Sequence, residues 1–97
     1  MKRLSKQKVE QIIGFAEAGE LDNVIGAVVR LAPEELAELK ALTWVGRETD
    51  SPRHWEALVI EARAKLDAHT PRLIAEDAAL GATLRRALQR MEEAGRI

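Results

Sequence analysis

Apolar residues recur at the spacing of an α-helix along nearly the whole 97-residue chain, and this pattern limits the folds open to it. One apolar face near the N-terminus is formed by Val9, Ile12, Ile13 and Ala16. A second, near the C-terminus, is formed by Leu80, Leu84, Leu88 and Met91. Several amphipathic helices of this kind bury their apolar faces against one another. The sequence therefore predicts an all-α fold of five to six helices in one compact domain, residues 1–97.

Residues that favour helix ends divide this pattern into separate helices. Ser5 and Asp22 are expected to cap the first two helices, and Gly19 is expected to end the first. The segment after Asp22 is rich in β-branched residues, so a strand is an alternative there. A lone strand would have no partner in an otherwise helical chain, and we therefore favour a helix.

The central helix is predicted over residues 34–45, with Pro33 in its first turn and Gly46 at its end. Its pattern becomes apolar on all sides toward the C-terminal end, which is typical of a helix that enters the core. Its acidic residues are interpreted as a solvated first turn, favoured by the helix dipole: Glu34, Glu35 and Glu38.

Ser51 and Pro52 are typical of a helix start, and we predict the next helix over residues 52–69. Its apolar face is formed by Trp55, Leu58, Val59, Ala62, Leu66 and His69. Thr70 and Pro71 repeat the same start signal. A short helix with its apolar side at Leu73 and Ile74 is expected to follow. Asp77 is expected to open the last helix, which Gly95 ends, although one helix over 70–94 is an alternative.

Composition excludes several kinds of chemistry. The chain has no cysteine, and hence no disulfide, catalytic thiol or thiolate metal site. It has no glycine-rich phosphate loop and no metal-ligand spacing, so we expect neither a cofactor nor an enzyme. Asp50, Ser51 and His54 lie close in sequence, but the Ser51 hydroxyl is needed as a cap and closeness alone does not make a triad. With no signal peptide and no uncharged run near the ~18 residues of a membrane span, we expect a cytoplasmic protein.

The most distinctive stretch is Glu38–Arg47, followed by Trp55. It resembles a small family of uncharacterised bacterial domains with an Ala-Leu-x-Trp-x-Gly-Arg-Gly signature and a tryptophan on the next helix. The matching positions are Ala41, Leu42, Trp44, Gly46, Arg47 and Trp55. Glu48 stands where the signature has its last glycine, and the tyrosine, proline and glycine-leucine pattern expected further on is absent. The resemblance covers roughly residues 5–90 and implies the fold but no activity.

The same stretch contains our candidate interaction residues, which are Trp44, Trp55, Arg47, Glu48 and Asp50. We favour the two tryptophans as core residues between helices, with a stacking pair or a partner contact as the alternative. Arg47 either hydrogen-bonds the end of the central helix or contacts an anion on a partner, and Glu48 and Asp50 are its expected ion-pair neighbours.

Charge is unevenly distributed: both ends of the chain are basic and the segment between them is acidic. Basic ends could contact DNA or RNA together with the helix pair 34–45 and 52–69. The candidate contacts are Lys2, Arg3, Arg85, Arg86 and Arg90. The acidic body opposes phosphate binding, so we rank this alternative second. Our first expectation is a small non-enzymatic helical protein that acts by protein–protein contact. It either self-associates or serves as an inhibitor or accessory factor from a mobile element.

Overall fold

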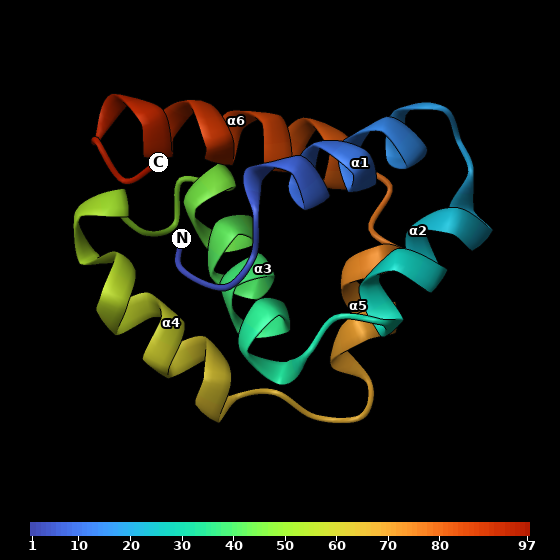
Figure 1. Cartoon of the computed structure of the whole chain (residues 1–97), viewed down its shortest axis with the longest axis horizontal. Helices are drawn as coiled ribbons and strands as arrows, with labels where there is room; N and C mark the ends of the chain where they lie inside the picture. The colour runs from blue at the N-terminus through green and yellow to red at the C-terminus, as the bar shows by residue number, and fades with distance from the viewer.

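Six α-helices and one short 3₁₀ helix form the secondary structure of residues 1–97, the whole chain, in a computed structural model (Figure 1). In chain order they are α1 (Lys6–Glu17), α2 (Leu21–Val29), α3 (Pro33–Gly46), η1 (Pro52–His54), α4 (Trp55–Ala64), α5 (Thr70–Ala75) and α6 (Leu80–Glu93). No strand is present, and this confirms the all-α prediction, including the helix over the β-branched segment. Residues 70–94 form two helices.

The central helix α3 organises the molecule. It packs against α4 on one side and α6 on another, while α1 lies along α6 and α2 packs against α5 (Figure 1). Leu39, Leu42 and Val45 of α3 are fully buried, in a core of 22 apolar residues to which every α-helix contributes. Burial on all sides agrees with the all-round apolar pattern predicted for its second half.

Several expected helix ends are confirmed. Ser5 accepts a hydrogen bond from the Lys8 amide, and Ser51 accepts one from the Arg53 amide. Pro33 is the first residue of α3. Gly19, with φ 73°, lies in the left-handed region just after α1, where a side chain would be strained.

The predicted helix over 52–69 is wrong in its second half, because α4 ends at Ala64. Asp67 accepts hydrogen bonds from the amides of His69 and Thr70 and so begins a turn. Such side-chain bonds compete with helical ones. His69 is therefore exposed outside α4, and Asp67 rather than Thr70 supplies the capping oxygen for α5.

Two further helix starts differ from the prediction. Asp22 lies inside the first turn of α2 and makes no capping bond, because the helix already begins at Leu21. Asp77 accepts from the Ala79 amide and forms the turn before α6, which begins at Leu80. The carboxylates sit at helix starts in both cases, and only their exact position differs.

Gly46 is the last residue of α3 rather than its stop signal. The left-handed residue is Glu48, with φ 62°, and the Thr49 amide reaches back to the Trp44 carbonyl. Gly46 is needed for another reason. A Cβ there would lie 2.1 Å from the Thr83 carbonyl oxygen, so only glycine allows α3 and α6 to approach this closely.

Candidate functional site

The two tryptophans occupy different environments. Trp55 is 5% exposed and belongs to the core, as expected. Trp44 is only partly buried at the edge of the core, so its interpretation as a core residue is correct only in part. The Lys65 ammonium lies 5.4 Å from the centre of the Trp44 ring, a cation–π distance. Trp44 thus keeps one surface toward solvent, while Trp55 is removed as an interaction candidate.

Arg47 pairs with a residue that the sequence did not indicate. Its guanidinium lies 2.6 Å from the carboxylate of Asp77, in the segment between α5 and α6. The expected pairing with Glu48 or Asp50 is wrong, because neither carboxylate forms a salt bridge with Arg47, whose partner Asp77 lies 30 positions further along the chain. Glu48 is exposed, and Asp50 contributes its backbone carbonyl to a bond from Arg90.

The ion pair is reflected in the titration of Asp77. The amide of Ala79 and, second, the Arg47 guanidinium hold the pKa of this carboxyl below its usual value. Both donors stabilise the charged form. Asp77 therefore stays ionised and keeps the Arg47 side chain in place over the end of α3.

Trp44 and Arg47 line a hollow of about 250 Å³ between α3 and α5. Leu73 of α5 lies at the same hollow and is 69% exposed. Leu73 was expected to face the core, but of its helix only Ile74 and Ala75 do so among the apolar residues. We call the surface formed by Trp44, Arg47 and Leu73 the tryptophan face. Sequence reasoning missed Leu73 because a six-residue helix is too short to show an apolar period.

The three C-terminal arginines that are candidate nucleic-acid contacts form hydrogen bonds with other parts of the same chain. Arg85 pairs with Glu17 through two hydrogen bonds, and this contact raises the pKa of the guanidinium. Arg86 donates to the Gly46 carbonyl at 3.0 Å, and Arg90 donates to the Val45 carbonyl at 2.6 Å. Two arginines of α6 thus satisfy carbonyls at the end of α3, the role considered for Arg47.

The acidic start of α3 is only partly solvated. Glu34 is exposed, as expected, whereas Glu35 accepts from the Lys8 ammonium and the Ala32 amide. These two bonds, that of Lys8 first, lower the pKa of Glu35. Glu38 is 3% exposed, so its interpretation as a solvated residue is wrong.

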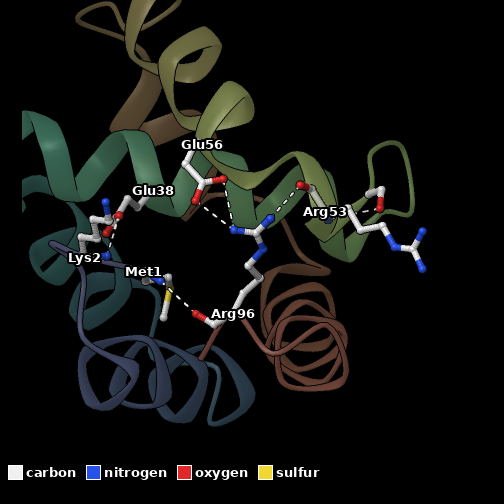
Figure 2. A network of polar contacts seen from close by, with 7 residues as sticks. Met1, Lys2, Glu38, Arg53, Glu56 and Arg96 are labelled. Atoms are coloured by element: carbon white, nitrogen blue, oxygen red, sulfur yellow. Dashed lines mark hydrogen bonds and ion pairs between the residues drawn. The ribbon is translucent and has the colours of Figure 1, made fainter.

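Glu38 holds the N-terminal segment against α3. Its carboxylate accepts hydrogen bonds from the amides of Lys2, Arg3 and Leu4. Figure 2 shows the contact with Lys2. Three donors satisfy carboxylate oxygens whose burial without hydrogen bonds would be costly. The signal available in the sequence was its position between two apolar residues, Ala37 and Leu39.

The two chain ends meet beside this contact. The Met1 amine donates to the Arg96 carbonyl, and the Arg96 guanidinium bonds the Glu56 carboxylate and the Arg53 carbonyl (Figure 2). A hydrogen bond from its own backbone amide is the main cause of the lowered pKa of Glu56, and Arg96 adds to it. Arg96 thus joins the C-terminal end of the chain to η1 and α4.

No group of three or more His, Cys, Asp and Glu side chains is arranged to hold a metal ion. None of the helices combines the length and the apolar character that crossing a membrane requires.

Comparison with known proteins gives one match. Neither a curated protein nor a solved structure matches the chain. Residues 20–92 match the family described as "Protein of unknown function (DUF3775)". This range contains α2 to α5, nearly all of α6, and the whole tryptophan face. Because the match covers well over half of the chain, the protein belongs to the DUF3775 family.

Proposed function

We propose that this protein acts by binding another protein through its tryptophan face. The observation that supports this most is the exposed side of Trp44, which adjoins Leu73 across a hollow edged by Arg47. Tryptophan and arginine are the residue types that most often dominate the energy of protein interfaces. A leucine left 69% exposed at the same place adds apolar area that a partner would remove from water.

The polar groups of this face suit a protein partner. Arg47 is held by Asp77 through one terminal nitrogen, which leaves other guanidinium donors for a carbonyl or carboxylate of the partner. Asp77 also limits the freedom of the Arg47 side chain, so less entropy is lost on binding. Lys65 lies against the Trp44 ring and adds a cation at the edge of the face.

Nucleic-acid binding remains the second candidate and has less support. Arg85, Arg86 and Arg90 are occupied by contacts within the molecule. Binding phosphates would require these contacts to break or to be shared. Affinity for DNA comes largely from phosphate contacts, and engaged arginines contribute less to it.

The test compares Leu73→Asp with Ile60→Asp, two matched changes of highly exposed apolar residues on different surfaces. Each variant and the parent are used to recover native partners from the source organism. A protein that both the parent and Ile60→Asp recover is then purified and its affinity measured. We expect Leu73→Asp to weaken binding by about tenfold or more. The reason is that burying a charged side chain in an apolar contact costs a few kcal/mol of binding free energy. Ile60→Asp should bind this partner like the parent.

Trp44 reports the contact directly. In a Trp55→Phe background Trp44 is the only tryptophan, and its emission should change when the partner binds. Equal affinity for Leu73→Asp and the parent, or recovery of nucleic acid in place of protein, would contradict the proposal. Light scattering of the free parent identifies a second copy as the partner if the measured mass doubles and Leu73→Asp restores the monomer.

A further inference from the structure

A groove of about 340 Å³ lies on another side of the molecule, between the N-terminal segment, α3 and α4. Ala37, Val59 and Ile60 supply its apolar residues. Ile60 is 72% exposed, more than any other large apolar residue of the chain. An isolated exposed isoleucine needs no explanation, but one beside an apolar groove adds to a surface that a partner can bury.

The groove is also bordered by basic residues that form no salt bridge. Lys2, Arg3 and Arg63 line it, and none of them forms a salt bridge. Seven other basic residues are paired, namely Lys6, Lys8, Arg47, Lys65, Arg72, Arg85 and Arg96. Glu34 is the exposed carboxylate of the groove and Glu38 the buried one. Its rim is therefore basic on the surface of a protein whose net charge is −1.

One wall of the groove is held in place before any ligand arrives. The buried carboxylate of Glu38 accepts hydrogen bonds from the backbone amides of Lys2 and Arg3, both at 2.9 Å, and both residues are exposed. The two cations are thus carried on an anchored backbone. Anchoring lowers the entropy lost when a ligand binds.

We propose that this groove binds an acidic, amphipathic segment of a partner protein. Apolar side chains of that segment would cover Val59 and Ile60, and its carboxylates would meet Lys2, Arg3 and Arg63. Nucleic acid fits less well, because the apolar floor offers nothing to a phosphate backbone and no aromatic ring lines the groove for base stacking. The inference uses a surface separate from the tryptophan face and does not depend on it.

The test is a selection from a random dodecapeptide display library against the intact protein, followed by affinity measurements on the enriched peptides. We expect enriched peptides that combine Asp or Glu with Leu, Ile or Phe. Their binding should weaken by about tenfold or more in the double variant Arg3→Glu/Arg63→Glu, and likewise in Ile60→Asp. All substituted side chains are exposed, so melting temperatures should match the parent.

Two matched controls separate the groove from general charge and from the tryptophan face. Arg30 is exposed, forms no salt bridge and lies elsewhere, at the hollow between α1 and α2, so Arg30→Glu should leave peptide binding unchanged. Leu73→Asp should leave peptide binding unchanged as well, whereas it should weaken binding at the tryptophan face. The two proposals can therefore fail separately.

Four results of the binding experiments would overturn the inference. They are no enrichment, enrichment of neutral or basic peptides, equal loss in Arg30→Glu and the groove variants, and duplex DNA binding at physiological salt that the groove variants abolish. The other occupant to test is a second copy of this chain. Its Leu21 is 49% exposed between Glu20 and Asp22, and these three residues have the acidic and apolar character proposed for the ligand. If the protein associates with itself and Ile60→Asp and Leu21→Asp each restore the monomer, the groove is a self-contact and the inference is wrong.

Discussion

A single buried carboxylate joins the N-terminal segment to the centre of the fold. Glu38 accepts three backbone hydrogen bonds, and Leu4, the last of its donors, is itself a core residue at 2% exposure. Burial of Leu4 therefore accompanies the hydrogen bond between its amide and the Glu38 carboxylate. The residue that orders this segment is therefore polar, although the core around it is apolar.

We predict that Glu38→Ala lowers the free energy of unfolding by about 2–4 kcal/mol, because it leaves three amides without an acceptor and one of them is fully buried. Urea unfolding followed by circular dichroism measures the change. Glu34→Ala, one turn earlier and exposed, is the control and should stay within about 0.5 kcal/mol of the parent. Equal effects of the two substitutions would show that Glu38 does not hold the segment in solution.

Glu48 adopts a conformation that suits glycine. Its φ of 62° is the only positive φ of a non-glycine residue in the chain, and the resemblance pattern places a glycine there. We predict that Glu48→Gly raises the stability by about 0.5–1 kcal/mol, since the relief of strain exceeds the added entropy of the unfolded chain. Thr49→Gly should instead destabilise. A loss of stability in Glu48→Gly would contradict this explanation.

Replacing Trp44 and replacing Trp55 by alanine should lower the free energy of unfolding by different amounts. Trp55→Ala removes a buried aromatic side chain and should cost about 3–5 kcal/mol. We expect Trp44→Ala to cost less, because Trp44 is only partly buried. Denaturant midpoints of the two variants give the comparison, and acrylamide should quench Trp44 more strongly than Trp55. An equal cost would place Trp44 in the core and remove it from the tryptophan face.

At the scale of whole elements, the C-terminal end of α3 is joined to α6 and to the segment before it. Arg86 and Arg90 of α6 bind its last carbonyls, Gly46 lets α6 approach, and Arg47 reaches the segment between α5 and α6. Helix ends carry carbonyls without partners inside the helix, and charged donors from another helix satisfy them best. The tryptophan face is built on this rigid end.

The link between α3 and the segment before α6 should depend on pH. The pKa of Asp77 is lowered from its usual 3.8 in the folded state. The stability that ionised Asp77 gives to the folded state is therefore fully present above this value. It is lost as the pH falls through the lower pKa of the folded state. We predict that Asp77→Asn costs no more than about 1 kcal/mol at neutral pH and that the difference from the parent disappears in acid.

Thermal unfolding across the acid range measures this difference. In an Arg47→Ala background, the effect of Asp77→Asn on stability should be smaller but still present. The reason is that the Ala79 amide is the larger cause of the low pKa of Asp77. A difference between parent and Asp77→Asn that is the same at every pH would show that the charge of Asp77 does not contribute.

At the scale of the whole molecule, we predict a single cooperative unfolding transition. One core of 22 residues includes side chains from α1 to α6, so no helix can leave without exposing part of it. Calorimetric and van't Hoff enthalpies should agree, and circular dichroism and tryptophan emission should share one midpoint. An earlier transition that removes only part of the helical signal would contradict this prediction, and α2 and α5, which pack together, are the helices expected to unfold in it.

Much of the fold could be predicted from the sequence, and less of the site. The helices around Val9–Ala16 and Leu80–Met91 were predicted because an apolar period is repeated within each segment. Helix ends were less accurate, since Asp67 and Asp77 compete for nearby amides in ways that spacing does not reveal. For the site, Trp44 and Arg47 were identified by residue type, whereas Leu73 was assigned to the core.

By itself, the sequence determined the helical content and several caps, because these depend on residues a few positions apart, such as Ser5 and the Lys8 amide. Only the tertiary structure decided which polar groups are buried and paired. Glu38 and Leu4 lie 34 positions apart, Arg47 and Asp77 lie 30 apart, and Arg90 and Val45 lie 45 apart. No local period encodes such pairs, since they form only when packed helices bring distant segments within hydrogen-bond distance.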